Sequence, residues 1–201
     1  MARDETAVAM QKLAMRDQLI TERGRQPLMD VPLDARAIAE QLLHTDAVQR
    51  AATVAAYVSV GKEPGTGPLI EALHAYRRRV ILPTLLPDND LDWAEYAGPD
   101  RLVPGPRGLL EPAGPRLGVD AVATADVVLV PGLAVDGTGM RLGRGGGSYD
   151  RALGRVPVGT FVCVLLYDGE LVDAVPSDVH DRRVVAAATP TGVTYFSRAA
   201  G

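Results

Sequence analysis

The sequence is poor in cysteine, in aromatic residues and in long apolar runs. Cys163 is the single cysteine of 201 residues, which excludes an internal disulfide and a thiolate metal cluster and favours a reducing compartment. Aromatic residues make up 4%, so the core must consist mostly of Ala, Val and Leu. No apolar run approaches the roughly 20 residues of a membrane span, and the charged Met1–Glu5 start does not resemble a signal peptide. We therefore expect a cytoplasmic protein without membrane contacts.

An excess of positive charge is also lacking. The chain has 21 Lys and Arg against 25 Asp and Glu, a net charge of −4, and this balance argues against nucleic acid as a partner. Hydrophobic residues make up 47%, enough for a substantial core, so global disorder is excluded. The length fits one domain over residues 1–201.

Apolar patterning predicts strands that alternate with helices. Helices are expected at 4–24, from 31–34 through Leu43, and at 69–77; buried strands at 53–60, 80–86, 91–96, 127–130 and 160–167, with a short edge strand at 184–188. The proline- and glycine-rich residues 97–119 should form an irregular excursion. Because these strands are apolar throughout, we predict a single α/β domain: a mostly parallel central sheet with helices on both faces. Ligands of such folds bind at the carboxyl ends of the strands.

The segment 136–151 combines glycines, arginines and a carboxylate after a predicted buried strand. Glycines let backbone N–H groups approach an anion closely, and the guanidinium groups of Arg141 and Arg144 match phosphate geometry. Asp150 is suited to Mg²⁺. A flexible linker or a structural turn is the alternative, but the two arginines, the Tyr149–Asp150 ending and the preceding strand favour an anion site. The spacing fits neither a P-loop nor a dinucleotide fingerprint.

This segment resembles the 5-formyltetrahydrofolate cyclo-ligases, also called 5,10-methenyltetrahydrofolate synthetases. The specific part is Val130-Pro131-Gly132-Leu133-Ala134-Val135-Asp136 followed by Arg141-Leu142-Gly143-Arg144-Gly145-Gly146-Gly147-Ser148-Tyr149-Asp150. Weaker supports occur in the expected order: Lys12 and Arg16, then Ser59, Glu63 and Thr66, then Gly108-Leu109-Leu110-Glu111-Pro112, and finally His180-Asp181.

The resemblance implies an activity and a set of roles. The reaction is ATP-dependent closure of 5-formyltetrahydrofolate to 5,10-methenyltetrahydrofolate, with Mg²⁺ as cofactor, and a monomer is expected. The implied ATP-binding residues are Lys12 and Arg16, on a helix 4–24 that covers the nucleotide site, with Arg141, Leu142, Gly143, Arg144, Gly145, Gly146, Gly147, Ser148 and Tyr149. The implied folate contacts are Val58, Glu63 and residues 144–148, the metal ligands are Asp150 and Asp181, and the catalytic residues are Arg144, Tyr149 and Asp150.

Several residues depart from the family pattern. Ser148 stands where a tyrosine is frequent, Val135 where a phenylalanine is frequent, and the strand 160–167 lacks a common glutamine. These departures keep a non-catalytic folate- or nucleotide-binding paralogue open as an alternative. Another phosphate-handling enzyme, such as a sugar-phosphate isomerase or a CoA transferase, is a third hypothesis. Without the resemblance, Lys12 and Arg16 would be surface residues, Glu63 a turn residue and Asp181 a loop acid.

Four further residues are predicted to have no role in catalysis or ligand binding. Cys163, flanked by Val162 and Val164, is expected to be a small buried hydrophobe. His44 and His74 are expected on the surface, and the three histidines lack the spacing of a zinc site. Trp93 is expected in the core.

Overall fold

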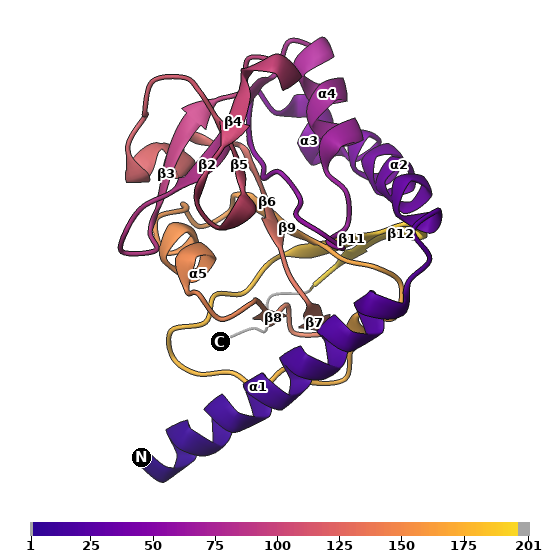
Figure 1. The fold of residues 1–201 in the computed structure, drawn as a ribbon, viewed down its shortest axis with the longest axis vertical. Coiled ribbons are helices and arrows are strands. Elements are labelled where there is room, and N and C mark those ends of the chain that lie inside the picture. The colour runs from indigo at the N-terminus through magenta and orange to yellow at the C-terminus, as the bar shows by residue number, and fades with distance from the viewer. Residues whose placement is uncertain (1, 197–201) are drawn as a thin grey trace.

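A computed structural model describes residues 2–196 (Figure 1). Its α-helices are α1 (Ala2–Arg25), α2 (Asp30–Leu43), α3 (Asp46–Arg50), α4 (Gly67–Ala75) and α5 (Ser148–Leu153). The strands are β1 (Thr53–Ala55), β2 (Arg79–Leu85), β3 (Leu91–Glu95), β4 (Leu102–Pro104), β5 (Leu110–Pro112), β6 (Val127–Pro131), β7 (Ala134–Asp136), β8 (Arg141–Leu142), β9 (Phe161–Leu165), β10 (Leu171–Val172), β11 (Ala186–Thr189) and β12 (Gly192–Tyr195). Three 3₁₀ helices are η1 (Pro99–Arg101), η2 (Pro106–Gly108) and η3 (Val119–Thr124).

A seven-stranded sheet forms the centre of the molecule, with the order β12-β11-β9-β6-β1-β2-β3. The five inner strands are parallel: Val54 of β1, for example, is in register with Val80 of β2 and Val127 of β6. The two edge strands, β12 and β3, run antiparallel to their neighbours. The predicted mostly parallel sheet is confirmed.

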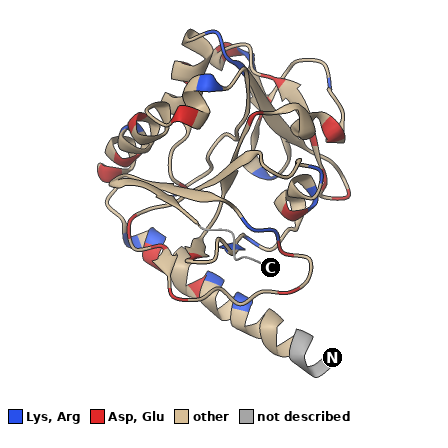
Figure 2. Cartoon of the chain, turned by 180° about the vertical axis from the view of Figure 1, so that it is seen from behind, with Lys and Arg blue, Asp and Glu red and all other residues tan. Residues whose placement is uncertain are grey.

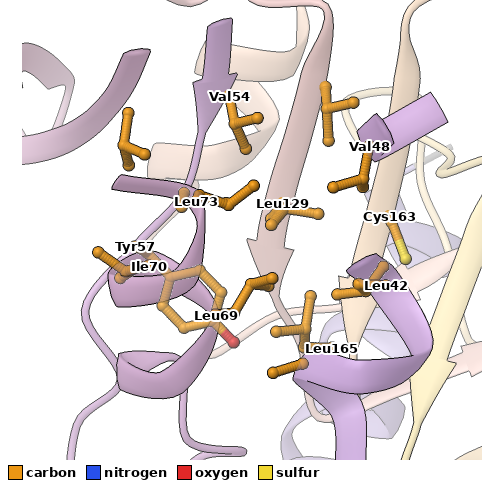
Figure 3. Close-up of a cluster of buried hydrophobic side chains, with 14 of the residues drawn as sticks. Leu42, Val48, Val54, Tyr57, Leu69, Ile70, Leu73, Leu129, Cys163 and Leu165 are labelled. Atoms are coloured by element: carbon orange, nitrogen blue, oxygen red, sulfur yellow. The ribbon is translucent and has the colours of Figure 1, made fainter. Parts of the chain in front are cut away.

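Apolar side chains cover both faces of this sheet. On one face, Leu42 of α2 and Leu69 of α4 pack against Val54, Leu129 and other strand residues, and Cys163 lies inside the same cluster (Figure 3). The opposite face is covered by η3 and the short α5. Trp93 belongs to this second cluster and is fully buried, as expected from its apolar surroundings.

Helix α1 lies along one side of the molecule, beside the small sheet β10-β7-β8 (Figure 1). Leu19 packs with Leu133, Met140 and Leu142 in a separate apolar cluster. The outer face of α1 stays in solvent, where Met10 is exposed. The inner face therefore attaches the helix to the segment that follows β6.

Several elements differ from the sequence-based expectations. The strand expected at 53–60 ends at Ala55; after a last backbone hydrogen bond from Ala56 to Ile81 of β2, Tyr57, Val58 and Val60 line a cavity. The strand expected at the edge, 184–188, is β11 and lies inside the sheet, because the unpredicted β12 pairs with it. The excursion 97–119 contains the hairpin β4–β5. Short or glycine-containing strands such as these give weak apolar periodicity, so the sequence pattern missed them.

Charged residues of both signs are distributed over the whole ribbon, as expected from the balanced composition (Figure 2). None of the helices in the range 2–196 is both long enough and apolar enough to cross a bilayer.

Candidate active site

A cavity of about 450 Å³ opens at the carboxyl ends of the central parallel strands. Its walls come from chain segments that follow β1 and β6, from β2 and β3, from the loop between β4 and β5, and from the glycine-rich segment before α5. This is the position at which an α/β sheet is expected to bind its ligand. The apolar part of the lining includes Val58, Pro83, Leu85, Leu91 and Leu109.

The glycine loop, residues 143–147, forms one wall of the cavity between β8 and α5. Gly145 and Gly147 have φ angles of 96° and 69°, a conformation that costs other L-residues energy. Gly145 also packs against the Arg16 guanidinium, where an added Cβ would lie 3.2 Å from Cζ. Arg16 Nε donates a hydrogen bond to the Gly143 carbonyl at 2.9 Å. Helix α1 is thereby fixed to this loop.

The two arginines that are predicted to bind phosphate form ion pairs with carboxylates that are also predicted to belong to the site. Arg141 Nη2 lies 3.0 Å from Asp150 Oδ1, and Arg144 Nε lies 2.9 Å from Glu63 Oε1. The Arg144 side chain is 54% exposed, whereas Glu63 is 6% exposed and also accepts a hydrogen bond from the Val60 amide at 2.9 Å. Glu63 is therefore held rigidly while its arginine partner faces the cavity.

Lys12 is buried and contacts two carboxylates outside the cavity lining. Its Nζ lies 2.5 Å from Asp181 Oδ2 and 2.7 Å from Asp178 Oδ2. Burial alone would lower the pKa of Lys12, but the hydrogen bonds and charges of Asp178 and Asp181 outweigh this and raise the pKa. Lys12 is therefore charged, and it ties α1 to the loop that contains Asp181.

The structure thus brings most of the predicted residues together. Val58, Glu63, Arg141, Gly143 and the residues from Arg144 to Asp150 all line the cavity. Arg16 donates a hydrogen bond to the glycine loop at the Gly143 carbonyl, and Lys12 and Asp181 form an ion pair outside the cavity lining. Leu142 is the exception, because its side chain is buried in the cluster beneath α1 and does not line the cavity.

Asp150 and Asp181 each leave one carboxylate oxygen without a hydrogen bond from the described residues. Asp150 accepts from Arg141 and from the Arg182 amide through Oδ1, and Asp181 accepts from Lys12 and the Asp178 amide through Oδ2. Within residues 2–196 no group of three or more His, Cys, Asp or Glu side chains is placed to hold a metal. A cation here would take only one or two ligands from protein, which is the usual coordination of Mg²⁺.

Two tyrosines, Tyr57 and Tyr149, line the same cavity as Glu63. The rings of Tyr57 and Tyr149 meet edge-on, with centroids 6.4 Å apart. Burial and the neighbouring Glu63 charge raise the pKa of both hydroxyls well above the ordinary value, so both stay protonated. Tyr149 can therefore donate a hydrogen bond to a ligand at neutral pH.

Sequence reasoning missed part of the lining. The apolar pattern predicts strands at Tyr57, Leu85 and Leu91 and an irregular excursion at Arg107, yet all four residues line the cavity. The run Gly108–Pro112 gave a signal for this wall, since it was already one of the weaker parts of the resemblance. The histidines His44, His74 and His180 are exposed and do not line the cavity.

The fold and the cavity define a class: an α/β enzyme with an arginine- and glycine-rich wall suited to an anionic ligand. The model of the 5-formyltetrahydrofolate cyclo-ligase family matches residues 8–190. The protein named 5-formyltetrahydrofolate cyclo-ligase from Mycolicibacterium smegmatis is 42% identical over 143 residues, which are 69% of this chain and 73% of that protein. Its namesake from Escherichia coli is 35% identical over 154 residues, which are 73% of this chain and 82% of that protein.

The solved structure of 5,10-methenyltetrahydrofolate synthetase from Aquifex aeolicus has the same fold, with a TM-score of 0.80 at 24% identity over 94% of this chain and 95% of that one. This chain belongs to the 5-formyltetrahydrofolate cyclo-ligase family. The resemblance found in the sequence and the predicted enzyme class, a ligase of folate one-carbon metabolism, are confirmed by the family model and the two relatives.

Proposed function

We propose that this protein closes 5-formyltetrahydrofolate to 5,10-methenyltetrahydrofolate at the expense of ATP, releasing ADP and phosphate. The observation that carries the proposal is the cavity itself: its apolar walls adjoin the glycine loop and the ion-paired residues Arg144 and Glu63. A ligand with a ring system and a ligand with phosphates can meet there. We further propose a cytoplasmic monomer that binds neither membranes nor nucleic acid.

The chemistry needs no protein nucleophile. In the first step, the oxygen of the N5-formyl group attacks the γ-phosphorus of ATP, and ADP leaves. In the second step, N10 attacks the formyl carbon and loses its proton, and the bond between this carbon and the phosphorylated oxygen breaks with release of phosphate. An amide oxygen leaves poorly as hydroxide and readily as phosphate. Phosphoryl transfer of this kind depends on positioning and charge neutralisation, which arginines and backbone amides supply.

The proposed roles follow the geometry. On the ATP side, Arg141 and Arg144 would hold the phosphates with the amides of residues 143–149, while Arg16 braces the loop through the Gly143 carbonyl. Lys12 would contribute charge beside the loop rather than from the cavity wall. Leu142 would contribute only its backbone, since its side chain is buried.

On the folate side, Glu63 would accept hydrogen bonds from the pterin N–H groups, and Val58 and residues 144–148 would contact the ring. Arg144 joins the two halves, because it bonds to Glu63 and belongs to the glycine loop. The catalytic residues are therefore proposed to be Arg144, the protonated Tyr149 and Asp150.

Mg²⁺ fits the donors that Asp150 and Asp181 offer, since each has one oxygen free of hydrogen bonds from the described residues. When bound there, the ion would neutralise phosphate charge. Arg141 keeps Asp150 in place through its own hydrogen bond.

The direct test follows methenyl-folate absorbance after 5-formyltetrahydrofolate, ATP and Mg²⁺ are mixed with the protein. We expect turnover by the wild type and a loss of at least about 100-fold in Arg144→Gln, since a charge aimed at the transition state is worth roughly 3 kcal/mol. Arg50→Gln is the matched control, because Arg50 is 82% exposed and lies outside the cavity lining. Tight folate binding by a folded wild type without ATP consumption would instead support the non-catalytic paralogue.

A further inference from the structure

Three arginines line the cavity, and they differ in how their charge is compensated. Arg141 is paired with Asp150 and Arg144 with Glu63. Arg107 donates from Nη2 to the neutral amide oxygen Oδ1 of Asn89 at 2.6 Å. Among the described residues, Arg107 is thus the cavity-lining arginine without a carboxylate partner.

The backbone around Arg107 is held in an uncommon conformation. Arg107 and Asn89 have φ angles of 57° and 65°, in the left-handed region; asparagine adopts this conformation readily, whereas arginine rarely does. Arg151 of α5 donates from Nη2 to the Asn89 carbonyl at 2.6 Å, so both turns are linked to the helix that follows the glycine loop. Strain of this kind is retained where the surrounding structure fixes it, often at ligand sites.

The loop that carries Arg107 is anchored above the cavity. Glu111 of β5 is 6% exposed and accepts a hydrogen bond from the Leu85 amide at 2.8 Å, which fixes the hairpin to the end of β2. Next to Arg107 along the wall, Leu109 and Leu110 also line the cavity, and Leu110 is 46% exposed. This rim therefore presents apolar surface followed by a solvent-accessible cation.

We propose that Arg107 binds the carboxylates of the glutamyl tail of the folate, and so sets a preference for substrates with an anionic tail. The inference rests on the proposed function, which places the ring system between Glu63 and the glycine loop. An aminobenzoyl ring could then lie against Leu109 and Leu110, with the dicarboxylate at the rim. A guanidinium pairs with a carboxylate through two parallel hydrogen bonds, and the exchange gives up only a bond to a neutral amide.

The experiment compares the wild type, Arg107→Gln and Arg107→Lys on two substrates: 5-formyltetrahydrofolate and its dimethyl ester, in which both glutamyl carboxylates are neutral. Dissociation constants are measured by calorimetry without ATP, and KM values from methenyl absorbance. For the free acid we expect Arg107→Gln to raise both constants about two- to fivefold, the range for an exposed ion pair. The ratio of the ester constant to the free-acid constant should fall by the same factor in Arg107→Gln. In Arg107→Lys this ratio should lie between those of the wild type and Arg107→Gln. High salt should weaken the wild-type preference.

Arg101→Gln is the matched control, because Arg101 is exposed on the same hairpin side and does not line the cavity. Equal weakening of acid and ester in Arg107→Gln would overturn the proposal, since Arg107 would then act through the shape of the loop. If Arg107→Gln raised the KM for ATP and left the KM for folate unchanged, the proposal would also be overturned, because Arg107 would then bind a phosphate of ATP and not the carboxylates of the tail.

The two proposals can fail separately. If the wild type binds the free acid in an Arg107-dependent way but never forms methenyl-folate, the proposed reaction is refuted and the tail site stands. If turnover is normal and acid and ester are discriminated equally by wild type and Arg107→Gln, the reaction stands and the tail site is refuted.

Discussion

Removing one partner of the buried ion pair between Arg23 and Glu170 should be among the most destabilising single substitutions in this chain. Arg23 Nε and Nη2 donate to the two carboxylate oxygens of Glu170 at 2.6 and 2.7 Å, and Nη2 also donates to the Gly132 carbonyl at 2.7 Å. The side chains are 5% and 9% exposed. Burial by itself would lower the pKa of Arg23, but the hydrogen bonds and charge of Glu170 raise it. Arg23 is therefore charged in the folded state.

Replacing Arg23 by methionine leaves the Glu170 carboxylate buried without its counter-charge. Breaking such a pair from one side costs about 3–5 kcal/mol. For a chain of this size, each kcal/mol corresponds to about 2–4 °C in Tm, so the expected drop is roughly 6–20 °C. The double variant Arg23→Met with Glu170→Gln should cost less than the sum of the single changes, because no buried charge remains unpaired.

Urea unfolding followed by circular dichroism measures these free energies, and a thermal scan gives Tm. The exposed pair Arg50–Asp46, at 82% and 81% exposure, is the matched control, and Arg50→Met should change stability by less than about 1 kcal/mol. The reasoning is wrong if Arg23→Met costs no more than that control, or if the two buried substitutions are additive.

Three other consequences can be measured. Cys163 is fully buried and its pKa is raised by burial, so it should react with a thiol reagent in urea and stay unreactive in the native protein; rapid native labelling would contradict this. The hydrogen bonds from Arg155, at 2.5 and 3.0 Å, lower the pKa of Asp90 despite burial. The stability from this pair is therefore fully present above the unfolded pKa of Asp90, about 4, and is lost as pH falls through the lower folded pKa. Asp90→Asn should flatten the dependence of unfolding free energy on pH in this range. An unchanged dependence would show that the pair does not cause it. Gly139→Ala should cost at least about 2 kcal/mol in urea unfolding, because φ is 79° and the new Cβ would lie 2.3 Å from the Val184 carbonyl oxygen; a smaller loss would mean that the turn can shift.

The strands with continuous apolar runs were predictable from sequence. The expected strands 127–130 and 160–167 correspond to β6 (Val127–Pro131) and β9 (Phe161–Leu165), because a strand buried on both faces must be apolar at every position. The glycine loop was predictable for the opposite reason: a segment so rich in glycine and arginine cannot pack as a hydrophobic core. The sequence therefore predicted an anion site in this loop, and the structure places the loop in the cavity wall.

Partners distant in sequence were not predictable. Arg144 and Glu63 are 81 residues apart in the sequence, and Lys12 and Asp181 are 169 residues apart. The local sequence around one residue of each pair does not indicate which distant residue it contacts. Arg107 gave even less signal, since its place on the cavity depends on how the β4–β5 hairpin is anchored by Glu111.

The sequence by itself thus determined the alternation of strands and helices and the family to which the chain belongs, because both are encoded in local runs of residues. Only the tertiary structure decided which charges meet, which side chains face the cavity, and where Leu142 points. The physical reason is that ion pairing and burial depend on distances across the chain, and those distances exist only after the sheet has assembled.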